Sequence, residues 1–188
     1  LMEIQNRAHP RKPVRVSNGD KGVAILLLAA GRSTRMGDKG FHKLLAEFDG
    51  VPLVRRSAMA AVAANAASVT VVVGHRRSEV IDALASLQIK FVENIEYASG
   101  ISSSLIVGCK SDLVKDADGV LVMLADMPNL SHSELDSLIS AFQRSGGRAI
   151  VRDVAFCKRG NPVSLRRVLF DTAMELQGYE GARHILEC

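Results

Sequence analysis

The chain contains the segment Leu26-Leu27-Leu28-Ala29-Ala30-Gly31-Arg32-Ser33-Thr34-Arg35-Met36-Gly37, with Lys43 six residues further on. A short apolar run ends at a glycine, and a loop with two arginines follows. This order suits a polyphosphate site at the end of a buried strand, because backbone N–H groups of a glycine-containing loop can approach oxyanions and cations neutralise their charge. An ordinary strand-to-helix turn with solvated arginines is the alternative.

The loop does not match two familiar phosphate-binding motifs. Five residues separate Gly31 from Gly37 and Asp38 follows, whereas a P-loop has four residues between its glycines and then Lys-Ser/Thr. Ser33 stands where a dinucleotide-binding fingerprint has its second glycine. The segment therefore indicates an anion site of another kind.

Apolar strands alternate with amphipathic helices from Val23 onward, which predicts an α/β domain. We expect a three-layer, mostly parallel sheet with helices on both faces, a Rossmann-like arrangement. The expected strands are residues 23–29, 69–73, 89–92, 120–124 and 149–152. The expected helices are residues 52–66, 78–87, 102–113, 131–145, 164–174 and 181–186, with Ser78 and Ser131 as N-caps.

Residues 1–22 hold two prolines and no apolar periodicity, and we expect a flexible linker or tail there, joining an upstream domain. They carry five basic and two acidic residues, which leaves only +1 of the net charge of +4 on residues 23–188. That balance argues against a nucleic-acid partner. No apolar run approaches the roughly 20 residues that cross a bilayer, so we expect no membrane partner.

The three cysteines, Cys109, Cys157 and Cys188, are too far apart to indicate a disulfide framework or a C-x-x-C metal site. Cys109 and Cys157 are typical of small core residues in a reducing cytosol, and we expect a cytoplasmic protein.

Three residues follow the ends of expected strands: Gly31, Gly74 and Asp126. Ligands of open α/β sheets bind at the carboxyl ends of strands, so these residues can converge on one edge. A carboxylate there, near a phosphate loop, can hold Mg²⁺. A turn or helix-capping aspartate is the alternative for Asp126, although Ser131 is the better cap. Asp153 and Asp171 are weaker metal candidates.

The segment at residues 28–37, followed by Lys43-Leu44-Leu45, resembles the signature of nucleotidyltransferases that activate sugars and cofactors. Within them the chain most resembles the molybdenum cofactor cytidylyltransferases, relatives of the molybdopterin-guanine dinucleotide synthases. The resemblance covers residues 23–188, the expected nucleotidyltransferase domain. It also rests on Pro52-Leu53-Val54, Gly100-Ile101-Ser102-Ser103-Ser104-Leu105, Leu124-Ala125-Asp126-Met127-Pro128 and Gly160-Asn161-Pro162-Val163.

The resemblance implies a Mg²⁺-dependent enzyme of EC class 2.7.7 that moves CMP from CTP to the terminal phosphate of molybdopterin or molybdenum cofactor and releases pyrophosphate. A recipient molybdoenzyme would be its partner. The expected catalytic residues are Arg35, Lys43 and Asp126, and Asp126 is the expected metal ligand. The expected nucleotide-binding residues are Leu28, Ala29, Ala30, Gly31, Gly74, Gly100, Ser103 and Ser104. Gly160 and Asn161 are expected at the acceptor, with a turn as their alternative.

Two features depart from the family pattern. Histidine is usual where Asn161 stands, and the later acidic motif near D-x-D-T-P is absent, through either truncation or reliance on Asp126 with the substrate phosphates. Three alternatives stay open: guanylyl transfer to molybdopterin, nucleotidyl transfer to a sugar or polyol phosphate, and a non-catalytic cofactor-binding chaperone for molybdoenzymes.

Overall fold

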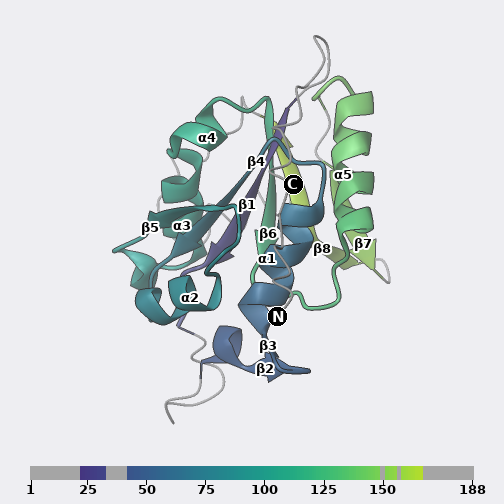
Figure 1. Ribbon diagram of the computed structural model, residues 1–188. Coiled ribbons are helices and arrows are strands. Elements are labelled where there is room, and N and C mark those ends of the chain that lie inside the picture. The colour runs from purple at the N-terminus through teal and green to yellow at the C-terminus, as the bar shows by residue number, and fades with distance from the viewer. Residues whose placement is uncertain (1–21, 33–41, 149–150, 156–157, 167–188) are drawn as a thin grey trace, which may run out of the picture.

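A computed structural model describes residues 22–32, 42–148, 151–155 and 158–166 of the chain. Its centre is a six-stranded sheet in the order β5-β4-β1-β6-β8-β7 (Figure 1). The strands are β1 (Val23–Ala29), β4 (Ser68–Val73), β5 (Lys90–Glu93), β6 (Gly119–Leu124), β7 (Val151–Ala155) and β8 (Lys158–Arg166). A separate hairpin pairs β2 (Glu47–Phe48) with β3 (Val51–Pro52).

Every residue of strand β1 is buried, as expected of a strand at the middle of the sheet. It pairs in parallel with β4 on one side and with β6 on the other. Its side chains alternate between two cores: Ile25 and Leu27 belong to one, and Leu26 and Leu28 to the other. A continuous apolar run is what a strand covered on both faces requires.

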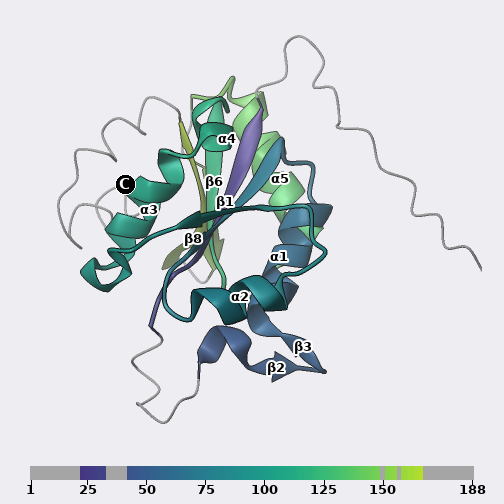
Figure 2. The same ribbon diagram turned by 60° about the vertical axis from the view of Figure 1, so that its left-hand side comes forward.

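Helices cover both faces of the sheet (Figure 2). The core that includes Ile25 also takes residues of α1 (Leu53–Ala63), α2 (Arg77–Ala83) and α5 (His132–Arg144). The opposite core takes residues of α3 (Ile101–Cys109) and α4 (Asp112–Lys115). Two short 3₁₀ helices, η2 (Lys43–Leu45) and η3 (Tyr97–Ser99), complete the described elements. The predicted three-layer α/β fold is confirmed.

The predicted elements differ from the structure mainly in the last third of the chain. The helix expected at 164–174 is wrong in its described part, because residues 164–166 belong to β8, antiparallel to both β6 and β7. Val163 and Leu165 of that strand are buried in the α3 and α4 core, so burial against the sheet outweighs helical propensity. The turn alternative for Gly160 and Asn161 is also wrong, since both lie in β8. The helix expected at 181–186 lies outside the described residues.

Helix starts were predicted with mixed success. Ser131 caps α5 in a capping box with Glu134, as expected. Ser78 does not cap α2, whose N-cap is Arg76 with φ 51°. The helix expected at 102–113 is two helices, because α3 ends at Cys109 and α4 begins at Asp112, with Ser111 as its N-cap residue.

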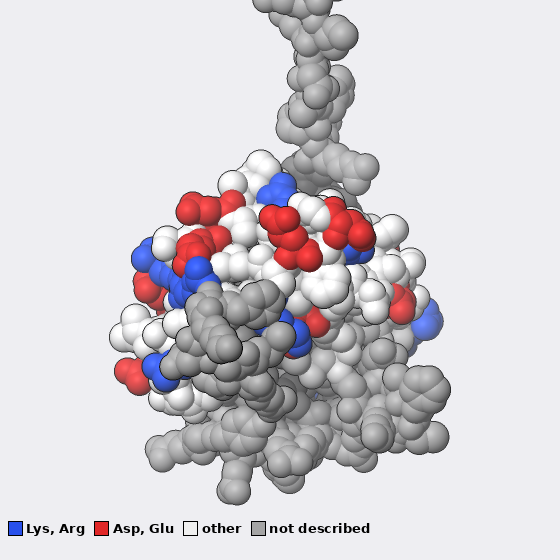
Figure 3. Space-filling view, turned by 90° about the horizontal axis from the view of Figure 1, so that it is seen from below, with Lys and Arg blue, Asp and Glu red and all other residues white. Residues whose placement is uncertain are grey.

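Cys109 is buried in α3, as predicted, and burial raises the pKa of its thiol to about 12. Cys157 and Cys188 lie outside the described residues. Within the described part of the chain, no helix has both the length and the apolar character that a membrane crossing requires. On the face in Figure 3, acidic and basic side chains are interspersed.

Candidate functional site

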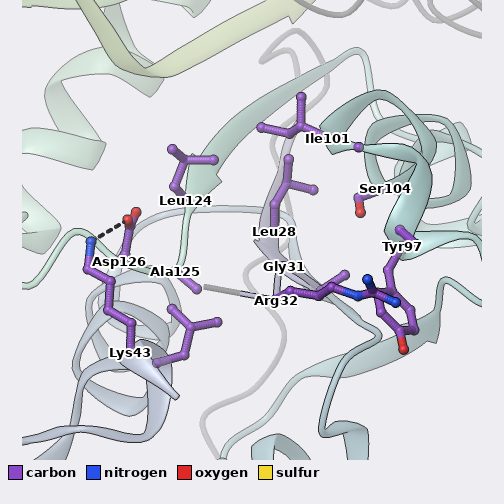
Figure 4. A pocket seen from close by; sticks show the side chains of 14 residues that line it. Leu28, Gly31, Arg32, Lys43, Tyr97, Ile101, Ser104, Leu124, Ala125 and Asp126 are labelled. Carbon is purple, nitrogen blue, oxygen red and sulfur yellow. Dashed lines mark hydrogen bonds and ion pairs between the residues drawn. The ribbon is translucent and has the colours of Figure 1, made fainter. Parts of the chain in front are cut away.

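A cavity of about 550 Å³ opens at the carboxyl edge of the sheet, beyond the ends of β1 and β6 (Figure 4). Its volume lies in the range of small-molecule sites. The end of β1 contributes one part of its lining, η2 a second, the η3–α3 segment a third and the end of β6 a fourth. The lining residues are Leu28, Ala30, Gly31, Arg32, Lys43, Leu44, Tyr97, Ala98, Gly100, Ile101, Ser104, Leu124, Ala125 and Asp126.

An ion pair marks one side of this cavity. Lys43 Nζ donates to Asp126 Oδ2 at 2.8 Å, and the two side chains keep 43% and 36% of their surface exposed. Exposed ion pairs contribute about 0–1 kcal/mol to stability. Both groups are therefore free to exchange partners with a charged ligand at little cost to the fold.

Ser57 of α1 contacts the backbone of the turn that contains Asp126. The Ser57 hydroxyl donates to the carbonyl of Ala125 at 3.0 Å and lies 3.3 Å from the carbonyl of Met127. Ser57 is buried, so this contact is shielded from water. It anchors the backbone on both sides of Asp126.

His42 holds the start of the glycine loop. Its Nε2 lies 3.2 Å from the carbonyl oxygen of Gly31, and the side chain is buried. Burial lowers the pKa of His42, more than the Gly31 hydrogen bond raises it. A carbonyl can only accept, so the neutral ring carries its proton on Nε2 and donates it to Gly31.

The rings of His42, His75 and Tyr97 form a row of neighbouring rings that ends at the other side of the cavity. The His75 ring lies 5.5 Å from that of His42 and 5.9 Å from that of Tyr97. The Arg32 guanidinium lies over the Tyr97 ring at 5.5 Å, within the range of a cation–π contact. Figure 4 shows Arg32 and Tyr97 across the cavity from the Lys43–Asp126 pair.

Gly74 does not line the cavity, but its lack of a side chain lets two lining residues approach each other. A Cβ at this position would lie 2.8 Å from the Cβ of Tyr97 and 2.9 Å from the Cβ of Ala30. Only glycine lets these two lining residues approach so closely. The residue predicted to bind nucleotide therefore acts here through its neighbours.

The serine-rich start of α3 is tied to the end of β5 by Asn94, which is fully buried. Asn94 Nδ2 donates to Ser103 Oγ and to Ser104 Oγ, each at 2.9 Å. Ser104 lines the cavity, whereas Ser103 Oγ is within hydrogen-bond distance of the carbonyls of Glu96 and Gly100.

The structure brings together most of the predicted site residues it describes. Seven line the cavity: Leu28, Ala30, Gly31, Lys43, Gly100, Ser104 and Asp126. Ala29 packs into the core on the opposite face of β1. Arg35 and Asp171 lie outside the described residues, and Asp153 lies in β7. Gly160 and Asn161 lie in the first half of β8, which begins near the carboxyl end of β6, because the strands are antiparallel and Val163 pairs with Val122.

Sequence reasoning did not identify Ser57, Asn94, Tyr97 or His42. Ser57 carried one signal, a hydroxyl on the otherwise apolar face of an alanine-rich helix. The others had no local pattern.

The described residues contain no cluster of three or more His, Cys, Asp or Glu side chains that could enclose a metal. Asp126 is the sole carboxylate among the residues that line the cavity. Mg²⁺ is commonly held by one or two carboxylates together with substrate phosphates and water. The donor set therefore fits a metal that arrives with a polyphosphate.

Comparison with known proteins finds a family model that matches most of the chain. A family model described as "MobA-like NTP transferase domain" matches residues 25–187. The bifunctional protein GlmU of Pelobacter propionicus is 33% identical over 161 residues, which are 81% of this chain and 32% of GlmU. The chain thus spans about a third of the length of this curated relative.

Solved structures share the fold. Rv0371c of Mycobacterium tuberculosis H37Rv matches with a TM-score of 0.74 and 22% identity, over 90% of this chain and 84% of its own. Another structure of Rv0371c is a complex with manganese. A CMP:2-keto-3-deoxy-manno-octonic acid synthetase complexed with CTP matches at a TM-score of 0.63 and 13% identity, over 87% and 81% of the two chains.

Proposed function

Since the chain belongs to the MobA-like NTP transferase domain family, which is a nucleotidyltransferase family, we propose that it moves CMP from CTP to the terminal phosphate of molybdopterin and releases pyrophosphate. The observation that carries this proposal is the 2.8 Å Lys43–Asp126 pair on one side of the cavity. On the other side lies an uncharged wall formed by Leu28, Ile101 and Ser104, here called the neutral side, and the Arg32 guanidinium beside it faces the Tyr97 ring. The charged side suits a triphosphate, and the neutral side suits a base.

In the proposed reaction, an oxygen of the acceptor phosphate attacks the α-phosphorus of CTP. A new P–O bond forms, the bond from the α-phosphorus to the bridging oxygen breaks, and pyrophosphate leaves with that oxygen. The attacking phosphate is already ionised near neutral pH, so no strong general base is needed. Catalysis then depends on in-line positioning and on charge neutralisation.

Three charged residues have roles in this scheme. Lys43 compensates charge on the triphosphate, and Arg35 is proposed to do so with its planar guanidinium. Asp126 would hold Mg²⁺ together with the phosphate oxygens, where the cation would stabilise the charge that develops there. Supporting this choice, a neighbour in fold has been solved with manganese.

CTP is chosen over GTP for two reasons. Ala30 stands where guanylyltransferases resembling this chain tend to have glycine, and it lines the cavity. A neighbour of the same fold was solved with CTP. Molybdopterin is chosen as acceptor because the motif blocks resemble those of molybdenum cofactor cytidylyltransferases.

The proposal is tested with a nucleotide panel scored by pyrophosphate release. Purified protein receives Mg²⁺, molybdopterin and one of CTP, GTP, UTP or ATP, with Asp126→Asn as the matched inactive control. We expect turnover with CTP and little with the others. GTP outcompeting CTP would identify guanylyl transfer instead.

An acceptor panel tests the second half of the proposal. Replacing molybdopterin with sugar or polyol phosphates should abolish pyrophosphate release from CTP. Release with a sugar phosphate alone would overturn the choice of acceptor. Tight binding of CTP or molybdopterin with no release in any combination would favour a non-catalytic carrier.

A further inference from the structure

The neutral side of the cavity is organised by a residue that does not line it. Asn94 follows β5, is 0% exposed, and donates its backbone N–H to the carbonyl of Val73 at 2.8 Å. Its side chain joins the end of the sheet to the first turn of α3 through Ser103 and Ser104.

The orientation of the Asn94 amide is fixed by its oxygen. Asn94 Oδ1 accepts the backbone N–H of Glu96 at 2.9 Å, so the amide nitrogen must face the serines. Both amide protons are then used, one on Ser103 Oγ and one on Ser104 Oγ. Each serine accepts from Asn94, and each hydroxyl proton must be donated elsewhere.

The two serines differ in where that proton can go. The Ser103 hydroxyl has the carbonyls of Gly100 at 2.8 Å and Glu96 at 2.9 Å as acceptors. For the Ser104 hydroxyl, the described part of the chain offers no hydrogen-bond acceptor, and the residue lines the cavity. The Ser104 oxygen keeps one lone pair, but its proton has no acceptor within the described residues, so a ligand atom that accepts this proton satisfies it best.

We propose that Asn94 is a positioning residue that holds Ser104 as a hydrogen-bond donor toward an acceptor atom of the nucleotide base. This inference rests on the proposed function, in which the cavity takes a nucleotide. The base is favoured over the phosphates because Leu28, Ile101 and the Tyr97 ring line the cavity beside Ser104, and the Arg32 guanidinium on this side faces the Tyr97 ring (Figure 4). The Lys43–Asp126 pair lies on the other side of the cavity in the same view.

The polarity set by Asn94 has a consequence for base selection. Cytosine presents two adjacent acceptors, its O2 and N3, to a donor approaching that edge. A base that presents an N–H group there could bond only to the remaining lone pair of Ser104 Oγ, and the buried Ser104 proton would stay unpaired. Asn94 thereby favours acceptor-rich base edges although it is itself shielded from the ligand.

The test compares CTP with ribose 5-triphosphate, which lacks a base, by calorimetric titration in the presence of Mg²⁺. Ser104→Ala removes the donor, and Ser111→Ala, which removes a hydroxyl bonded to the Gly108 carbonyl at the other end of α3, is the control. Asn94→Asp keeps the size and the Glu96 contact, but its carboxylate only accepts, so it draws the Ser104 proton away from the ligand.

We expect Ser104→Ala and Asn94→Asp each to weaken CTP binding about tenfold and to leave ribose 5-triphosphate binding within twofold. Ser111→Ala should leave both ligands within about twofold. The double variant should bind CTP no more weakly than either single variant, since both act through one hydrogen bond.

Equal weakening of CTP and ribose 5-triphosphate would show a general collapse of the wall and overturn the inference, as would unchanged CTP binding in Ser104→Ala. If Asn94→Asp does not fold, Asn94→Ala, which removes both donors to the serines, takes its place in the comparison with Ser104→Ala and Ser111→Ala. Wild-type protein that fails to bind CTP would contradict the proposed function as well, which separates the two failures.

Discussion

The two sides of the cavity are built in opposite ways. On the charged side, Lys43 and Asp126 meet in one ion pair and stay more than a third exposed. On the neutral side, Asn94 and Ser104 are buried and belong to a hydrogen-bonded network. An exposed pair adds little to stability, whereas a buried network is costly to leave half satisfied. The charged side chains are thus free to exchange partners with a ligand. The hydrogen bonds of the neutral side are already formed before a ligand binds.

This contrast predicts that changes on the charged side affect activity without affecting the fold. Asp126→Asn should lower kcat by about a thousandfold or more, since it removes the carboxylate proposed to hold the metal. Nucleotide binding should be partly retained, and the melting temperature should change by no more than a few degrees. Steady-state pyrophosphate release with a thermal melt measures both. Activity within tenfold of wild type would remove Asp126 from the mechanism.

Lys43→Met keeps the length of the side chain and removes its charge. We expect about a hundredfold loss in kcat/KM for CTP, because one preorganised cation on the triphosphate is lost. The free energy of unfolding should change by less than about 1 kcal/mol, since the ion pair is exposed. Denaturant unfolding and initial rates give the two values. A loss of stability larger than the loss of transition-state energy would make Lys43 structural instead.

Ser57 lies between the two cases, because it is buried and acts on the exposed carboxylate. Ser57→Ala should lower kcat about tenfold and raise the KM for Mg²⁺, as the turn around Asp126 loosens. It should also destabilise the protein by about 1 kcal/mol through the lost hydrogen bond. Ser137→Ala, which removes an exposed hydroxyl bonded to the Ser133 carbonyl, is the matched control. An unchanged Mg²⁺ dependence would limit Ser57 to a packing role.

The same contrast explains how far the sequence predicts the site. Gly31 and Asp126 follow buried strands that are adjacent in the sheet, so strand periodicity alone brings them to one edge. Lys43 is close to that loop in sequence. The charged side could therefore be predicted from short spacings and one topological rule.

The buried contacts that hold the walls of the cavity in place cannot be predicted from the spacing of residues in the sequence. Asn94 reaches Ser104 across a turn, and Ser57 reaches Ala125 across 68 positions of the chain. Each is a single polar residue whose importance comes from burial beside a particular carbonyl or hydroxyl. The strand at 158–166 was missed for a related reason, since its antiparallel pairing with β6 and β7 outweighs its local pattern.

His42 gives the smallest expected effect, and its sign follows from burial. Because burial lowers its pKa in the folded protein, the unfolded chain binds more protons as the pH falls below about 6.5. The His42 contribution to stability is therefore fully present above that pH and is lost as the pH drops toward its lowered folded-state pKa. His42→Gln can keep an amide N–H on the Gly31 carbonyl and cannot titrate. The variant should lose less stability than wild type between pH 7 and 5.5, by at most about 1.4 kcal/mol per pH unit. Chemical denaturation at several pH values measures the difference, and parallel curves for the two proteins would contradict this role for His42.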